Sequence, residues 1–219
     1  MYSTRIRKIA EMVPEGMVTA DIGTDHAFLP ILLASEKKCG KIYACDVRKG
    51  PLQAAEKNIS EAGLSDAIAC ILSDGLENVP EDTECVVIAG MGAYTAMHIL
   101  EAAEKRIPSF STVLIEVNRN VKEMREWLSG HHCIITDEVF LEEKGHAYTI
   151  MACVYGKEKL TESEILLGPV LMKKKDPAWL NYLKEEKEKK EKLLTLRPED
   201  EELKSDYGII SCYLNDEGH

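Results

Sequence analysis

The chain has 219 residues, of which 45% are hydrophobic and 30% charged, and its formal net charge is −11. This length suits one α/β domain with a small appendage. The acidic balance argues against a dedicated nucleic-acid-binding protein, whose phosphate contacts need clustered Lys and Arg, but not against an enzyme with a local basic face. The sequence has no run of about 18 apolar residues and no signal-peptide core, so we expect a cytoplasmic protein with no membrane partner.

The seven cysteines form no CxxC pair, and most of them lie inside apolar runs. This pattern indicates buried free thiols rather than disulfides or a zinc site. The histidines show no HExxH spacing. We therefore expect no metal centre.

Helices and strands alternate along most of the chain. Residues 3–12 predict a helix, with Ser3 as its N-cap and the Pro14–Gly16 segment as its end. The predicted strands are residues 17–22, 41–46, 67–72, 85–89 and 112–117. The predicted helices between them are residues 26–36, 51–62, 94–106 and 121–129. Because short, continuous β-branched runs suit strands covered on both faces, this alternation indicates a doubly wound parallel sheet.

A hairpin follows the fifth predicted strand. Residues 133–141 and 147–155 are strand-like, and a short segment with a glycine separates them. Five parallel strands followed by an antiparallel hairpin are typical of the seven-stranded, Rossmann-like sheet of class I S-adenosylmethionine-dependent methyltransferases. A six-stranded dinucleotide-binding fold fits this ending less well.

The composition changes after this hairpin. A long charged helix is predicted over about 177–195, and a second helix carries Leu203, Tyr207, Ile210 and Leu214 on one face. The two helices predict a coiled-coil-like C-terminal α-helical hairpin. We therefore expect a methyltransferase domain over residues 1–156 and a helical hairpin over residues 157–219.

The segment ADIGTDHA, residues 20–27, connects the first strand of the sheet to a helix. A glycine here lets the backbone turn sharply against a ligand, and the helix N-terminus offers free N–H groups. The GxGxxG pattern and the P-loop are both absent. S-adenosylmethionine has no phosphate, so a loop with less glycine can hold it. The residues assigned to the cofactor in this loop are Asp21, Gly23, Thr24 and His26.

Acidic residues follow the next two strands at the same edge of the sheet. Asp46 can accept hydrogen bonds from both ribose hydroxyls, and Asp74 can accept one from the adenine amino group. Each acid alone is more often a cap or turn residue, but their ordered appearance with glycine loops between them predicts a cofactor site. The residues assigned to the cofactor at these strand ends are Asp46, Val47, Asp74, Gly75, Leu76, Gly90 and Met91.

Several of these segments resemble a known family. ADIGTDHAFLP, SDGLENV, AGMGAYTAMHILEA and DEVFLEEKGHAYTI resemble the bacterial TrmK family of tRNA (adenine-N1)-methyltransferases, which act on adenosine 22 in the D arm. The resemblance implies S-adenosylmethionine as cofactor and tRNA as partner, and it implies no DNA and no protein partner. Two departures stand out. Ala93 replaces the last glycine of the usual AGMGG, and Glu116-Val117-Asn118 replaces the usual QPN, so that only Asn118 is retained.

The loop after the fourth predicted strand indicates which nitrogen of adenine is methylated. Enzymes that methylate an exocyclic adenine amine typically carry an Asn/Asp-Pro-Pro-aromatic loop there, whereas this chain has AGMG. Its absence favours the ring nitrogen N1, whose methylation leaves a cationic adenine. Asp25 is the candidate catalytic carboxylate for that charge, although it could instead cap the following helix. The resemblance adds Asn118 to the catalytic set, while the role of His26 stays open between the cofactor, Asp25 and simple packing.

The substrate side is less specific. N1 lies on the Watson–Crick edge, so the base must be extruded, and the small Gly92 would leave room for it. Arg5 and Arg7 on the first helix are the candidate phosphate contacts. The C-terminal hairpin serves either tRNA binding or packing and dimerisation. Two other functions compete: a methyltransferase for a small molecule or protein, and a cofactor-binding module without turnover.

Overall fold

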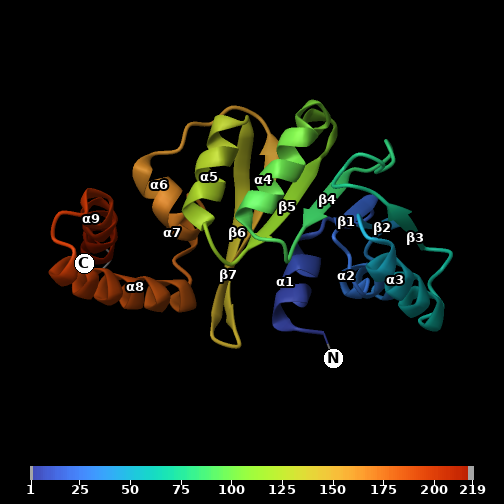
Figure 1. The fold of residues 1–219 in the computed structure, drawn as a ribbon, viewed down its shortest axis with the longest axis horizontal. Coiled ribbons are helices and arrows are strands. Elements are labelled where there is room, and N and C mark those ends of the chain that lie inside the picture. The colour runs from blue at the N-terminus through green and yellow to red at the C-terminus, as the bar shows by residue number, and fades with distance from the viewer. Residues whose placement is uncertain (1, 217–219) are drawn as a thin grey trace.

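The computed structural model describes residues 2–216, which form a seven-stranded sheet with helices on both faces (Figure 1). The strand order is β3-β2-β1-β4-β5-β7-β6. Strands β1 to β5 pair in parallel, and β7 pairs antiparallel with both β5 and β6, as the sequence predicts. The strands are β1 (Thr19–Ile22), β2 (Ile42–Asp46), β3 (Ile68–Leu72), β4 (Cys85–Ile88), β5 (Thr112–Val117), β6 (Cys133–Glu143) and β7 (His146–Tyr155).

Two apolar cores lie on the two faces of this sheet. Helices α1, α2 and α3 cover one face, and α4 and α5 cover the other, where Figure 1 shows them in front of the strands. The helices are α1 (Thr4–Met12), α2 (Phe28–Ser35), α3 (Lys49–Glu61), α4 (Ala93–Ala102) and α5 (Val121–Gly130). The parallel strands are buried on both faces, which explains their continuous apolar sequence. This arrangement brings the strands' carboxyl ends, and the loops that follow them, to one edge.

Several element boundaries differ from those predicted. The helix after β4 ends at Ala102 and is followed by a 3₁₀ helix, η1 (Glu104–Ser109), because Pro108 cannot donate within an α-helix. Helix α3 begins before Pro51, which a first helical turn tolerates. Strands β6 and β7 are longer than predicted, so their turn is only Lys144-Gly145, both with positive φ.

The C-terminal helices form their own small core at the β6 end of the sheet (Figure 1). They are α6 (Glu162–Leu167), α7 (Leu171–Lys174), α8 (Pro177–Leu196) and α9 (Glu201–Asp216). Helices α8 and α9 run antiparallel, since Lys190 pairs with Asp206 while the Trp179 and Tyr213 rings lie 5.6 Å apart. Phe140 of β6 joins this core. The predicted hairpin is therefore present and rests on the sheet, while a division into two domains at residue 156 stays a prediction.

The cysteines are all free thiols. Most are buried, but Cys212 is exposed on α9, so the expectation of burial is wrong for that residue because the helix turns this face to solvent. Within residues 2–216 no helix is long and apolar enough to cross a membrane, and no cluster of side chains could hold a metal ion.

Candidate active site

A cavity of about 210 Å³ opens at the carboxyl edge of the sheet, between the loops that follow β1 and β4. The strand order reverses between these two strands, and such points are where open α/β sheets bind ligands. We call it the β1–β4 cavity. It gathers these residues predicted from the sequence: Arg5, Asp21, Gly23, Thr24, Asp25, His26 and Gly90.

Asp21 is the most buried carboxylate of this cavity, with 6% exposure. Burial raises its pKa to about 6, the Thr24 hydroxyl opposes this rise, and the charge of Asp46 adds to it. Thr24 Oγ1 is itself buried and makes no hydrogen bond of acceptable geometry with any described residue. Among the described residues Asp21 has no cation partner and Thr24 Oγ1 makes no well-formed hydrogen bond, and such incomplete pairing is typical of a place where a polar ligand binds.

The backbone around the cavity depends on glycine. Gly23 and Gly90 have φ angles of 77° and 74°, a region that disfavours side chains. A Cβ atom on Gly23 would also lie 3.0 Å from Met91 Cε, so the loops after β1 and β4 are packed against each other. Gly92 has a positive φ as well and begins α4. Glycine at position 23 thus permits the close contact between the two loops.

The end of β2 carries a buried acid beside an exposed apolar side chain. Asp46 is 4% exposed, and its Oδ1 accepts a hydrogen bond from the Arg48 N–H at 2.9 Å. Val47 is 56% exposed. Among the described residues no hydrogen bond reaches Asp46 Oδ2. A free carboxylate oxygen next to an uncovered apolar surface suits a ligand with hydroxyl groups and a flat ring.

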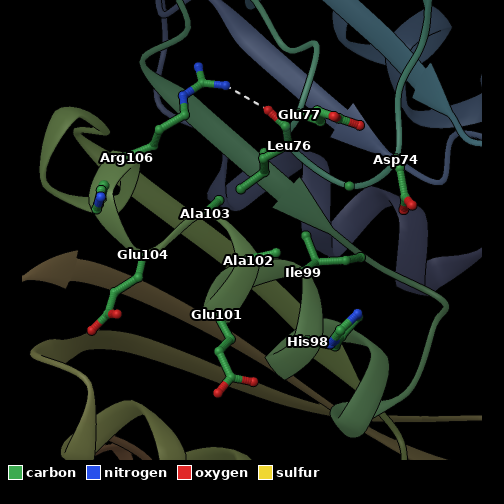
Figure 2. Close-up of a pocket in the computed structure, with 12 residues that line it drawn as sticks. Asp74, Leu76, Glu77, His98, Ile99, Glu101, Ala102, Ala103, Glu104 and Arg106 are labelled. Atoms are coloured by element: carbon green, nitrogen blue, oxygen red, sulfur yellow. Dashed lines mark hydrogen bonds between the residues drawn. The ribbon is translucent and has the colours of Figure 1, made fainter.

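The loop after β3 borders a second, larger cavity of about 530 Å³, between this loop, α4 and η1 (Figure 2). Asp74 is exposed there, whereas Leu76 is buried. Arg106 Nη1 donates to the Leu76 carbonyl oxygen at 2.6 Å and holds the loop in place. Gly75 is required at its position, because a Cβ would lie 3.0 Å from Ile99. Despite its size this cavity contains none of the β1 and β4 loop residues, so we place the reaction site at the β1–β4 cavity.

An ion pair forms one wall of the β1–β4 cavity. Arg5 Nη1 on α1 lies 3.0 Å from Glu116 Oε2 at the end of β5, and the same oxygen accepts the Gly90 N–H at 2.9 Å. The Arg5 guanidinium lies 5.1 Å from the centre of the Tyr148 ring. Burial raises the pKa of Glu116, while Arg5 and the Gly90 N–H oppose that rise. Glu116, whose role the sequence left open, therefore connects α1 to the loop after β4.

Asp25 and His26 project from the loop after β1. Asp25 and Ala27 both have positive φ angles, 49° and 57°, which are strained for side-chain-bearing residues. Asp25 Oδ2 lies 3.7 Å from His26 Nε2, and the two side chains are 62% and 49% exposed. Helix α2 has Ala27 at its N-cap with no side-chain hydrogen bond. The alternative in which Asp25 caps this helix is therefore not seen, because among the described residues no N–H of the helix donates to its carboxylate.

Other predicted residues lie outside the β1–β4 cavity. Asn118 is exposed and lines a different cavity, of about 380 Å³, with residues of α5, α8 and α9. Arg7 is exposed on α1 and does not line the cavity that contains Arg5. A catalytic role for Asn118 and substrate contact by Arg7 and Gly92 stay predictions. Sequence reasoning missed Phe28, which lines the cavity, because its aromatic type was visible but its exposure was not.

Comparisons with known proteins agree with this geometry. The model of the TrmK family, tRNA (adenine(22)-N(1))-methyltransferase, matches residues 19–212. The Bacillus subtilis tRNA (adenine(22)-N(1))-methyltransferase is 32% identical over 185 residues, which span 81% of this chain and 78% of that protein.

Solved structures extend the match to nearly the whole chain. M. capricolum TrmK bound to S-adenosyl-homocysteine is 32% identical, with a TM-score of 0.86 and 98% of each chain covered. The B. subtilis enzyme TrmK is 27% identical in the structural alignment, with a TM-score of 0.81 and coverage of 98% of this chain and 96% of that one. The resemblance in the motifs is thereby confirmed: the chain belongs to the TrmK family of S-adenosylmethionine-dependent tRNA (adenine(22)-N(1))-methyltransferases.

Proposed function

We propose that this chain methylates N1 of adenosine 22 in the D arm of tRNA, with S-adenosylmethionine as the methyl donor. The observation that carries the proposal is the β1–β4 cavity, where the buried Asp21 carboxylate and the buried Thr24 hydroxyl lie beside the glycine turns of two strand ends. The membership of the chain in the TrmK family supports the choice of reaction and substrate.

The residues at the sheet edge fit the parts of S-adenosylmethionine. Asp21 suits the cofactor's ammonium group, because a nearby cation would offset the burial that raises the pKa of this carboxyl. Asp46 suits the ribose hydroxyls, and the exposed Val47 and the Asp74–Leu76 loop suit the adenine ring. When bound, S-adenosylmethionine supplies a methyl group on a cationic sulfur, and its transfer to N1 moves the positive charge to the target adenine.

The remaining residues of the cavity act on the target base. N1 carries an in-plane lone pair, so it needs alignment and charge compensation rather than a strong base. The exposed carboxylate of Asp25 offers negative charge at the cavity mouth. Arg5 uses only Nη1 to bind Glu116, and among the described residues none accepts a hydrogen bond from its Nε or Nη2. These free donors suit a phosphate of the tRNA backbone.

The ion pairs of the C-terminal hairpin favour a role in packing over a role in binding phosphates through a broad basic surface. In the hairpin Lys190 pairs with Asp206, Lys189 pairs with Glu186, and Lys204 pairs with Glu201. These lysines are therefore partly neutralised, and phosphate contact through the hairpin is restricted to its other lysines. A tRNA substrate also implies that the protein works in the cytoplasm, with neither DNA nor membrane as partner.

The decisive experiment is position-resolved detection of methyladenosine after an unmodified tRNA transcript is incubated with the full chain and S-adenosylmethionine. Methylation at N1 blocks Watson–Crick pairing, so reverse transcription should stop next to position 22. A transcript with guanosine at position 22 is the matched control and should give no stop. Methyl transfer to the exocyclic amine, to another position or to no RNA at all would contradict the proposal.

A further inference from the structure

Three aromatic side chains lie together beside the β1–β4 cavity, and two of them, His26 and Phe28, line it. The His26 and Phe28 rings are 5.4 Å apart with an interplanar angle of 34°, and Tyr2 meets Phe28 edge-on at 6.4 Å. Phe28 is 49% exposed, and so is the His26 side chain. We call Tyr2, His26 and Phe28 the aromatic rim.

The exposure of Phe28 contrasts with the rest of its helix. Phe28 begins α2, and the next five residues, Leu29 to Leu33, are all buried. The backbone just before Phe28 is also held in place, because the Asn58 side chain donates to the His26 carbonyl oxygen at 3.0 Å and Ala27 has a left-handed conformation. An uncovered aromatic surface on an otherwise buried, rigid element offers a stacking platform to a ligand.

The aromatic rim faces the same space as the proposed reacting groups. His26 and Phe28 line the β1–β4 cavity together with Gly23, Asp25 and Gly90. A flat ring stacked on Phe28 would therefore occupy the cavity that the glycine turns of the β1 and β4 loops also line. Arg5 provides a cation that lines the same cavity, and Glu116 pairs with it.

We propose that the aromatic rim stacks the extruded target adenine and so selects an unpaired base, rather than a paired one, as the occupant of the cavity. This inference rests on the proposed function. Stacking on aromatic side chains is how proteins commonly hold unpaired bases, and every base offers the π face that it needs. The same aromatic faces attract a cation, so they also favour the positively charged ring that methylation at N1 produces.

Substitutions at Phe28 test this proposal. Phe28→Leu keeps an apolar side chain but removes the π face, whereas Phe28→Trp keeps the face. We expect Phe28→Leu to raise KM for tRNA by about 5- to 100-fold, the range expected for loss of one stacked base, while Phe28→Trp stays near wild type. The Kd of S-adenosylmethionine should be unchanged in both variants, which shows that the fold and the cofactor site are intact.

A matched control uses another exposed aromatic residue. Tyr155 is 50% exposed and meets His132 edge-on at 6.3 Å, but it lies at the end of β7 and does not line the β1–β4 cavity. Tyr155→Leu should leave KM for tRNA unchanged. An equal effect of Tyr155→Leu and Phe28→Leu would overturn the proposal, because it would indicate a general loss of surface apolarity.

A second measurement does not depend on turnover. A D-arm RNA with 2-aminopurine at position 22 is bound to the full chain in the presence of S-adenosylhomocysteine, and the fluorescence of the probe is read at saturation. Stacking on Phe28 should quench the probe in wild type and Phe28→Trp, and the signal should be brighter in Phe28→Leu. If wild type methylates N1 of adenosine 22 but the three proteins give equal KM and fluorescence, the stacking proposal fails while the proposed function stands. If wild type does not methylate that atom, the proposed function fails first.

Discussion

Two arginine–glutamate ion pairs in this molecule differ in how completely the rest of the protein covers them. Arg125 Nε of α5 lies 2.8 Å from Glu138 Oε1 of β6, and the two side chains are 3% and 0% exposed. In the other pair, Arg5 is 29% exposed while Glu116 is 2% exposed. One pair is sealed inside the protein and the other has an open side.

The sealed pair, Arg125–Glu138, has a structural role. Glu138 also accepts the N–H groups of Val170 and Leu171, and Arg125 Nη1 donates to carbonyl oxygens of α6. A Cβ on Gly168 would lie 2.7 Å from both charged groups, so only glycine fits. The sealed pair therefore fastens the C-terminal helices to the sheet.

The open pair, Arg5–Glu116, lies at the candidate active site. Nearby, Asp21 is buried without a cation and Thr24 Oγ1 lacks a partner within the described part of the chain. Incomplete pairing costs stability, and proteins retain such costs mainly where a ligand completes the pairing. The extent to which polar and charged groups have partners, rather than their burial alone, therefore distinguishes the sealed pair from the candidate active site.

The largest expected effect on stability comes from breaking the sealed pair, Arg125–Glu138. Arg125→Ala leaves the Glu138 carboxylate buried and unpaired, so we expect the free energy of unfolding to fall by about 3–5 kcal/mol. Urea unfolding of the full chain measures this loss. Arg7→Ala, at an exposed site on α1, is the control and should change stability by less than about 0.5 kcal/mol. A small effect of Arg125→Ala would mean that the pair is not essential to the attachment of the helices.

At Asp21 the expected effect on stability has the opposite sign. The folded chain raises the pKa of Asp21 from 3.8 to about 6, so it binds the proton more tightly than the unfolded chain does. Stability should fall as pH rises from about 4 to about 6, with a loss of up to about 3 kcal/mol at pH 7. Asp21→Asn should therefore stabilise the ligand-free protein at pH 7 by about 1–3 kcal/mol while it weakens S-adenosylmethionine binding.

Cofactor affinity gives an independent measure of Asp21. Binding of the cofactor's ammonium group requires the charged carboxylate, so affinity should rise with pH as pH passes through about 6. Calorimetric titration across this range measures the change. The rise should disappear in Asp21→Asn, and a pH-dependence that persists in that variant would assign it to another group.

The open pair should respond to the loss of a hydrogen-bond acceptor more than to the loss of charge. Glu116→Ala removes the acceptor of both Arg5 and the Gly90 N–H, so we expect stability to fall by about 1–3 kcal/mol and kcat/KM for tRNA to decrease. Glu116→Gln keeps an amide oxygen at that place and should retain most of the activity. Equal damage in the two variants would show that the negative charge itself is needed.

Asp25 should give the smallest effect on free energy, because its side chain is 62% exposed and water screens its charge. We expect Asp25→Ala to lower kcat by about tenfold and to leave the Kd of S-adenosylmethionine unchanged. Single-turnover methylation and equilibrium binding separate the two quantities. An equal loss of turnover and cofactor affinity would assign Asp25 to cofactor binding alone.

The sequence by itself determined the order of the strands, the glycines and acids at their ends, and the family. These features are local, because strand periodicity and turn residues are encoded within a few neighbouring positions. The position of Asp21, Gly23 and Gly90 at one edge of the sheet follows from this local pattern, since parallel strands bring their carboxyl ends together.

Only the tertiary structure decided which distant residues share a site. Arg5 and Glu116 are 111 positions apart, and Arg125 meets Glu138 and the Gly168 turn only after the C-terminal helices have packed on β6. The fold also placed Asn118 in another cavity and left Phe28 uncovered. Exposure and long-range pairing depend on what packs over a residue, and that is a property of the whole fold rather than of the local sequence.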